Sequence, residues 1–347
     1  MADPTFRITN NILNSIVKFE IEKKGIENKN LPEAIIQKAR LGANSEDIFH
    51  LGNMLELNLS LKTAGKIASG KTLGIEDYKG LYLTNFRNAI EYILATQSAY
   101  YPIQANILLH LNKILITGIA EEWDSKFRSG GEQINEQDDN WLQFTDKDIP
   151  SVEVQSQALK IIEWFASKQN QVHPLITIPV VLFRLIRIAP FVFGNKITIL
   201  ATCKYLFFKG GIYIDGLIPL TKNFALFEKE YFEAWKEAIS TNDDVTSWIE
   251  VFTRSFSGEA KTVGENVGKL LTEIRENNKQ PFLELNKRQL KILRYLQNIP
   301  LVKREEYVEI LDVSTMTAYR DLTQLVKKGL LRVEGHGRGT KYMLATR

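Results

Sequence analysis

Cysteine is almost absent from this sequence, because Cys203 is the only one among 347 residues. A single thiol excludes a disulfide framework and a thiolate metal cluster, and it fits the reducing cytoplasm. Histidine is scarce as well, and the four histidines, at positions 50, 110, 173 and 336, lack the spacing of zinc ligands. We therefore expect a cytoplasmic protein without a bound metal.

Long hydrophobic runs are also missing. The most apolar stretch, Pro179 to Phe193, is interrupted by Arg184, Arg187 and Pro190, which predicts a buried helix rather than a membrane span. The first residues lack the basic start and apolar core of a secretory signal. Apolar residues make up 44% and charged residues 24%, as in ordinary globular proteins. A chain of this length predicts two or three domains.

Basic charge is concentrated at the C-terminal end. From Lys287 to Arg347 there are 13 lysines and arginines against 6 acidic residues, a balance of +7, whereas the preceding residues carry 31 against 35, a balance of −4. This asymmetry is the electrostatic footprint of a unit that binds phosphate, although a solvated basic face has the same charge.

The C-terminal region predicts three consecutive helices. Apolar residues at positions 290, 292, 293 and 296 mark the first helix, which ends at a break at Ile299-Pro300. The second helix covers KREEYVEIL and turns three apolar side chains inward: Tyr307, Val308 and Leu311.

The third helix is predicted from Thr315 to about Lys328. Ser314 suits its N-cap, because a serine hydroxyl accepts one of the first free backbone N–H groups of a helix. Gly329 ends it, since glycine tolerates left-handed geometry. Three apolar side chains have the spacing to pack on the first two helices: Leu322, Leu325 and Val326.

Two short predicted strands follow, Leu330 to Val333 and Lys341 to Leu344, around a glycine-rich tip. Three helices and a hairpin in this order predict a winged helix-turn-helix, a small α+β domain, for residues 286–347. The segment VSTMTAYRDLTQLVKKGLL resembles the recognition segment of DeoR-like bacterial regulators. The resemblance implies that DNA is a partner.

The docking geometry of such domains places the start of the recognition helix in the major groove and the wing on phosphates. Seven residues are therefore expected to contact DNA: Thr315, Met316, Thr317, Tyr319, Arg320, Arg338 and Lys341. Such domains commonly bind two half-sites that are related by two-fold symmetry, so we expect a homodimer. The alternative is a winged helix that mediates protein contacts only, because a fold does not determine a function.

The central region is mostly long helical patterns between Tyr82 and Trp235, with one predicted β-hairpin or flap near Gly130-Gly131. The segment IRIAPFVFGNKITIL resembles the signature loop HPFx[D/E]GNGRxxR of the Fic (Fido) family. The surrounding motifs agree over roughly residues 60 to 235: LTNFRNA, LLHLNKIL, W-x-x-x-FR, IPSVE and a helix that starts at His173-Pro174-Leu175.

This resemblance implies a mainly α fold, in which a Fic-like helical bundle with a small hairpin flap precedes the winged helix. We expect an N-terminal helical region at 1–80, a Fic-like core at 81–240 and a connecting helical linker at 241–285. The winged helix-turn-helix completes the chain at 286–347.

Fic enzymes transfer AMP, or less often another phosphate-containing group, to a target hydroxyl. The resemblance assigns the loop's histidine as general base, its acidic residue as Mg²⁺ ligand, and its glycine-rich turn and arginines to phosphate binding. Here the histidine is replaced by Ala189, the acidic residue by Phe193, the second glycine by Lys196 and the two arginines by Ile197 and Leu200.

The loop keeps Pro190, Phe191, Gly194 and Asn195, which shape its turn but carry no chemistry. Loss of a general base alone slows a reaction by about 10²–10⁴. We therefore predict a pseudoenzyme without a catalytic residue or cofactor. Gly194, Asn195 and Lys196 are candidates for binding an anion at the helix start, although a lone lysine there is more often solvated.

Two short motifs overlap before the central region. SGKTLG at 69–74 resembles the inhibitory-helix pattern [S/T]xxxE[G/N] of Fic proteins, with Leu73 at the glutamate position. GKIASGKT at 65–72 satisfies the phosphate-binding pattern GxxxxGK[ST], and the leucines at 55, 57, 59 and 61 alternate as a strand does. We interpret the second motif as a chance match, because no Walker B aspartate and no strand–helix alternation follow.

The sequence thus predicts a DNA-binding regulatory protein whose Fic-like body serves interaction, dimerisation or ligand sensing. The main alternative is a Fic-type adenylyltransferase of reduced or altered activity, which would need ATP and Mg²⁺. A structural scaffold is a third possibility. His110 and His173 are interpreted as structural histidines, because neither has a carboxylate or nucleophile placed with it.

Overall fold

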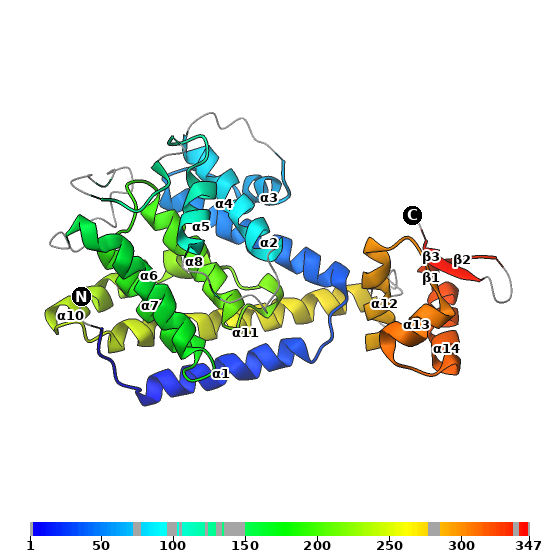
Figure 1. Cartoon of the computed structure of the whole chain (residues 1–347). Helices are drawn as coiled ribbons and strands as arrows, with labels where there is room; N and C mark the ends of the chain where they lie inside the picture. Colours follow the sequence, from blue (N-terminus) through cyan, green and yellow to red (C-terminus); the bar gives the residue numbers. More distant parts are fainter. Residues whose placement is uncertain are drawn as a thin grey trace. The chain divides into compact units, whose positions relative to one another are not determined.

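The computed structural model describes residues 3–71, 78–95, 103, 106–121, 124–129, 134, 150–276, 285–335 and 340–345. Within these ranges the chain forms fourteen α-helices and one small antiparallel sheet (Figure 1). It divides into two compact units, of which unit 1 comprises residues 1–25 and 39–264 and unit 2 comprises residues 26–38 and 265–347. The predicted mainly helical fold is confirmed, while most of the expected flap lies outside the described residues.

Unit 1 is entirely helical apart from isolated β-bridges, as far as it is described. The helices that lie wholly or mainly in it are α1 (Asn10–Glu27), α2 (Glu33–Met54), α3 (Leu61–Ala68), α4 (Tyr78–Ala95), α5 (Ile107–Ile116), α6 (Ser151–Lys168), α7 (Pro174–Ile188), α8 (Asn195–Lys209), α9 (Leu220–Leu226), α10 (Glu228–Ser240) and α11 (Thr246–Glu276). None of the helices in the described ranges is both long and apolar enough to cross a bilayer.

Helix α8 is the centre of unit 1. Its residues from Asn195 to Phe207 are all buried, and it packs against α4, α5 and α7. A helix surrounded on every side has no solvent face, which explains why its sequence, NKITILATCKYLFFK, has no amphipathic period. The loop that resembles the Fic signature connects α7 to this central helix.

Aromatic side chains join α7, α10 and α11. The ring of Phe183 lies 4.6 Å from Trp235 and 6.2 Å from Trp248, measured between centroids. The Trp248 indole also donates a hydrogen bond to the Pro179 carbonyl at 2.8 Å. Although we expected residues 241–285 to be a linker, the first part of α11, to Gly264, belongs to unit 1, where Trp248 packs against Phe183 and Trp235.

A buried ion pair joins α2 to α8. The Lys204 ammonium donates to the Asp47 carboxylate, and neither side chain is exposed. Asp47 also accepts from the backbone N–H and the hydroxyl of Thr221, each at 2.7 Å. Burial lowers the pKa of Lys204, but the charge and hydrogen bond of Asp47, together with the nearby Tyr213 and Cys203, outweigh it and leave that pKa raised. Removal of either partner would leave an uncompensated buried charge.

The alternating leucines before α3 do not form the strand that their pattern suggested. Leu55 and Glu56 form a turn, and Ser60 caps α3 by accepting a hydrogen bond from the Thr63 N–H at 3.1 Å. Residues 65–68 lie inside α3, so GKIASGKT does not connect a strand to a helix as a phosphate-binding loop must. Thr72 of this motif and Leu73 of the inhibitory-helix motif lie outside the described residues.

Unit 2 contains every element predicted for the winged helix. These elements are α12 (Lys287–Asn298), β1 (Val302–Lys303), α13 (Arg304–Leu311), α14 (Thr315–Lys327), β2 (Leu331–Glu334) and β3 (Lys341–Leu344). The sequence analysis missed β1, which pairs with β3 through Val302 and Tyr342 in a sheet of order β1-β3-β2. A strand of two residues is too short to have a periodic signature.

A hydrophobic core of unit 2 lies between α12, α13, α14 and the sheet. Tyr307, Leu322 and Leu325 are fully buried in it, as predicted. Leu290, in contrast, is only half-buried, and the neighbouring Gln289 is buried in its place. The polar side chain is accommodated because its amide donates to the Asp321 carbonyl at 3.3 Å.

Candidate functional site

The α7–α8 loop has a sharply turned backbone. Helix α7 ends at Ala189, whose φ of 37° is left-handed, and α8 begins after Gly194, with a φ of 71°. A Cβ atom at Gly194 would lie 3.1 Å from the Ile116 Cγ2 atom, so both conformation and space favour glycine there.

Arg128 holds the first half of this loop. Its Nε and Nη2 groups donate to the carbonyls of Ala189 and Ile188, both at 2.9 Å, and its backbone N–H donates to Pro190 at the same distance. Phe127 forms an isolated antiparallel bridge with Phe191, and the two rings stack 5.4 Å apart. Burial lowers the pKa of Arg128, although an arginine stays charged at physiological pH.

Two asparagines hold the second half of the loop. Asn195 accepts from the Phe191 N–H at 2.9 Å and donates to the Phe191 carbonyl at 2.7 Å. Asn112, from α5, donates to the Phe193 carbonyl at 2.9 Å and to the Thr198 hydroxyl at 3.1 Å. The polar side chains of the loop region therefore bind backbone and one another.

The positions that would carry transfer chemistry hold apolar side chains. Ala189, Ile197 and Leu200 are buried, and Phe193 is half-buried. None of these four side chains can accept a proton, coordinate a cation or pair with a phosphate oxygen. The loop therefore has a sharply turned backbone without reactive side chains at these four positions.

Lys196 differs from its expected state. We expected a solvated lysine, but its side chain is only 6% exposed and has an interaction partner within the protein. The interpretation as a solvated lysine is wrong, because α8 starts inside unit 1 rather than at its surface. Anion binding by Gly194, Asn195 and Lys196 stays a prediction.

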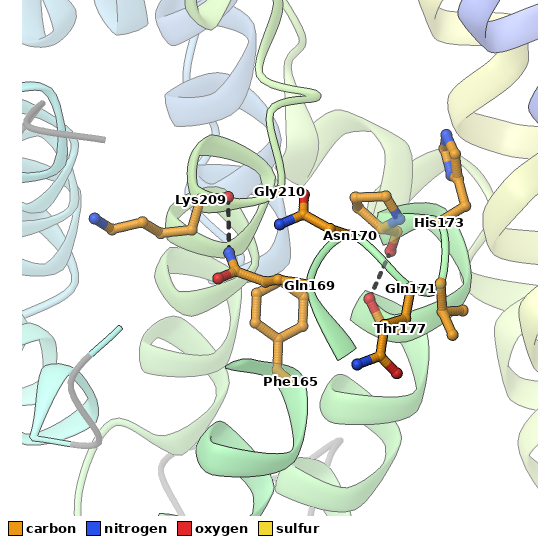
Figure 2. A pocket seen from close by; sticks show the side chains of 10 residues that line it. Phe165, Gln169, Asn170, Gln171, His173, Thr177, Lys209 and Gly210 are labelled. Atoms are coloured by element: carbon orange, nitrogen blue, oxygen red, sulfur yellow. Dashed lines mark hydrogen bonds between the residues drawn. The ribbon is translucent and has the colours of Figure 1, made fainter. Parts of the chain in front are cut away.

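A cavity of about 310 Å³ lies at the opposite end of α7 (Figure 2). Its lining residues are Phe165, Gln169, Asn170, Gln171, Val172, His173, Pro174, Thr177, Lys209 and Gly210. Since a helix rises 1.5 Å per residue, the length of α7 separates this cavity from the α7–α8 loop by roughly 20 Å. In Figure 2 the Lys209 ammonium points away from the other lining side chains. The cavity is therefore not part of the loop.

His110 and His173 both have partners in the structure, and the expectation that no carboxylate accompanies either is wrong for His173, which lies beside Glu20 from the distant helix α1. His173 caps α7, because its Nδ1 atom accepts from the Leu175 N–H at 3.1 Å, and its Nε2 atom lies 3.1 Å from Glu20 Oε1. Burial lowers the pKa of His173, and Glu20 opposes this shift. His110 Nδ1 lies 3.1 Å from the Asn106 carbonyl oxygen.

The recognition helix α14 starts as predicted. The Ser314 hydroxyl accepts a hydrogen bond from the Thr317 N–H at 3.2 Å. Four of the residues expected to contact DNA are exposed on this helix: Thr315, Met316, Tyr319 and Arg320. Thr317 is only partly exposed, and its hydroxyl lies 2.9 Å from that of Ser314.

Asp321 fixes α14 against the other two helices of unit 2. Its buried carboxylate accepts hydrogen bonds from Asn286 at 2.9 Å, from Arg288 Nε at 2.7 Å and from the Tyr307 hydroxyl at 3.1 Å. Burial raises the pKa of Asp321, but these hydrogen bonds outweigh it and the pKa is lowered. The network ties the orientation of the recognition helix to α12 and α13.

The wing is described only at its base. β2 and β3 pair antiparallel, and Lys341 lies opposite Glu334 on β2 and opposite Lys303 on β1. Lys341 is half-buried at this position. Arg338, the other residue expected to hold phosphate, lies outside the described residues.

Sequence reasoning missed Arg128, Asn112 and Asp321. Arg128 and Asn112 lie in two of the motifs that resemble the Fic family, W-x-x-x-FR and LLHLNKIL, but neither was assigned a role, because their partners are far away in the chain. The partners of Asp321 did carry a signal. Asn286 and Gln289 form the pattern Asn-x-x-Gln before an apolar run, which is typical of a capping box, and the structure contains that capping box.

Comparison with solved structures identifies the fold of the whole chain. A Fic family protein from Desulfovibrio desulfuricans matches with a TM-score of 0.60 and 14% identity, over 100% of this chain and 99% of that one. Fic-1 from C. elegans matches with a TM-score of 0.55 and 12% identity, over 72% of each chain. A Fic domain containing signaling protein from Bacteroides thetaiotaomicron has a TM-score of 0.55 and 13% identity, over 75% of this chain and 97% of that one.

Comparison of the sequence supports the C-terminal assignment separately. Residues 288–340 match the family model of the DeoR-like helix-turn-helix domain. A search of curated proteins gives no match. The chain therefore has the Fic fold and carries a DeoR-like helix-turn-helix domain, as the two sequence resemblances predicted.

Proposed function

We propose that this chain is a DNA-binding regulatory protein in which a Fic-fold body without transfer chemistry serves interaction, dimerisation or ligand sensing. The observation that carries the proposal is the start of α14, where Thr315, Met316, Tyr319 and Arg320 are exposed in a DeoR-like domain. These positions suit major-groove contact. The basic balance of this domain supports a polyanionic partner.

The chemistry of the α7–α8 loop supports the non-catalytic part of the proposal. Magnesium prefers oxygen ligands, and Phe193 supplies none at the position where the Fic motif has a carboxylate. Ala189 cannot act as a base, and Ile197 and Leu200 cannot neutralise phosphate. The residues present therefore do not fit ATP with Mg²⁺, and we derive no transfer step from them.

The alternative is a Fic-type adenylyltransferase of reduced or altered activity, with the winged helix assisting target recognition. The retained backbone favours it, because Gly194 keeps a left-handed turn at the start of α8. A homodimer that reads paired half-sites belongs to the preferred function, since symmetric regulators commonly bind two such sites.

The DNA part is tested by titrating the full chain into a labelled random-sequence duplex and following fluorescence anisotropy. We expect saturable binding with a dissociation constant of about 10⁻⁴–10⁻⁶ M that weakens as salt rises. Arg320→Ala should weaken binding, while Lys236→Ala, a matched cation on α10, should leave it unchanged. No binding at low salt would overturn this part.

The non-catalytic part is tested by calorimetry with ATP and Mg²⁺ and by incubation with labelled ATP. We expect no heat of binding at millimolar ATP and no self- or target-AMPylation. Ala189→His alone should not restore transfer, because Phe193 and Ile197 remain. Transfer by the unmodified chain would instead establish the adenylyltransferase.

A further inference from the structure

Two of the exposed residues of the recognition helix are apolar in character. Met316 is 68% exposed and Tyr319 is 50% exposed, although most side chains of this size are buried in proteins. They are three residues apart and share the face of α14 opposite its buried residues Ala318, Leu322 and Leu325. A thioether and a phenol ring are therefore accessible on this face.

The chemistry available on this face is narrow. From Ser314 to Arg320 the exposed or partly exposed side chains offer hydroxyls, a thioether, a phenol and one guanidinium, while Ala318 is buried. Asparagine or glutamine would read adenine through a bidentate hydrogen bond, and aspartate or glutamate would accept from cytosine. Neither kind of side chain is present in this segment. Arg320 alone has the geometry for a bidentate contact with guanine.

Thymine presents an apolar group in the major groove that an apolar side chain can contact. Its C5 methyl group is the distinctive apolar feature of the major groove, and apolar side chains contact it. When this methyl group packs against Met316 or Tyr319, apolar surface of both the base and the side chain is removed from water. The contact is therefore favourable without a hydrogen bond.

We propose that α14 reads DNA by burying thymine methyl groups against Met316 and Tyr319, so that its preferred half-site places thymine opposite this face. The inference rests on the proposed DNA-binding function and specifies which bases it selects. The Ser314 cap and the Asp321 network hold the helix in one orientation, which presents both side chains together.

The test begins with the full chain and a library of random duplexes, from which bound sequences are enriched. Thymines of the enriched duplex are then replaced one at a time by deoxyuridine, which removes only the C5 methyl group. We expect one or more replacements to weaken binding by about fourfold each, the value of one buried methyl group.

Paired substitutions locate the contact on the protein. Met316→Ala should bind the thymine duplex less tightly and should no longer distinguish it from the deoxyuridine duplex at one position. Ile299→Ala, a matched exposed apolar residue between α12 and β1, should keep the full discrimination. Because Met316 is so exposed, its replacement should not disturb folding, which an unchanged thermal unfolding temperature would verify.

The outcomes separate this inference from the proposed function. Equal binding of thymine and deoxyuridine duplexes by the unmodified chain would overturn thymine reading and leave DNA binding intact. Discrimination that survives in both Met316→Ala and Tyr319→Ala would overturn the assignment to this face. Failure to retain any duplex would overturn DNA binding and thymine reading together.

Discussion

Arg128 illustrates what a single residue does in this structure. Its guanidinium lies at the end of α7, where the last carbonyls of a helix have no partner inside the helix. Two of its N–H groups satisfy the carbonyls of Ile188 and Ala189, and its backbone binds Pro190. One side chain therefore ends a helix and holds the loop that follows it.

Substitution of Arg128 should loosen this loop. Arg128→Ala removes two charge-assisted hydrogen bonds and leaves buried carbonyls unsatisfied, so we expect a loss of about 1–3 kcal/mol in the free energy of unfolding. Arg128→Lys, which keeps the charge but not the two-pronged geometry, should lose part of this. Urea denaturation and hydrogen exchange at residues 189–194 would measure both. Unchanged exchange in the alanine variant would contradict the assigned role.

Asp321 predicts a pH dependence for unit 2. Its folded pKa is lowered by Arg288, Asn286 and Tyr307 despite burial. A lowered folded pKa means that this carboxylate stabilises unit 2 fully above its unfolded pKa of 3.8 and loses the effect as pH falls through the folded pKa. Asp321→Asn should therefore reduce stability near neutral pH and flatten its decline in acid.

Hydrogen exchange of the α12 and α14 amides, corrected for the intrinsic rates, would follow this dependence. Glu309→Gln, on α13, is a suitable control because Glu309 is exposed. Equal acid sensitivity of the Asp321→Asn variant and the unmodified chain would count against the network.

At the scale of elements, the starts of helices α14 and α8 differ in how they are capped and in how exposed they are. α14 begins at a serine cap, whereas α8 begins at a left-handed glycine without a side-chain cap. The first start is exposed and the second is buried inside unit 1. The two helix starts therefore have different uses, one open to a partner and the other enclosed by its own loop.

The cap of α14 gives a direct prediction. Ser314→Ala removes the acceptor for the Thr317 N–H and should destabilise the helix by about 1 kcal/mol. Because Met316 and Tyr319 lie in the first two turns, affinity for DNA should fall as well. Ser314→Asp supplies another capping oxygen and should preserve helix stability. Amide exchange at residues 315–319 would show whether the alanine variant frays.

At the scale of the whole molecule, charge is divided along the chain. The balance of +7 from residue 287 onward contrasts with −4 in the rest of the sequence. Phosphate binding by the basic part would release counterions from DNA, so affinity should fall linearly with salt on a logarithmic plot. The acidic balance of the remainder provides no similar attraction.

The wing cations should contribute to that slope. Arg338→Ala and Lys341→Ala should each weaken binding almost equally for different DNA sequences and reduce the magnitude of the salt slope by about one. Lys236→Ala again serves as the control outside unit 2. Titrations at several salt concentrations would measure the slope, and a sequence-selective loss would show base contact instead.

The sequence by itself determined three helices and the β2–β3 hairpin of the winged helix, and the chemistry missing from the α7–α8 loop. Helical spacing, the Ser314 cap and Gly329 are local signals, since a few neighbouring residues produce each of them. The loop's lost chemistry was equally readable, because Ala189 and Phe193 lack the necessary atoms whatever surrounds them.

Only the tertiary structure decided the burial of Lys196, the helix at α3 and the packing of α11 into unit 1. The packing of α11, for example, depends on a contact between distant parts of the chain, the hydrogen bond of Trp248 to Pro179. The stretch around α3 alternates as a strand does, but no partner strand lies beside it among the described residues. The local sequence pattern determines which secondary structures a segment favours, and packing against distant parts of the chain selects one of them.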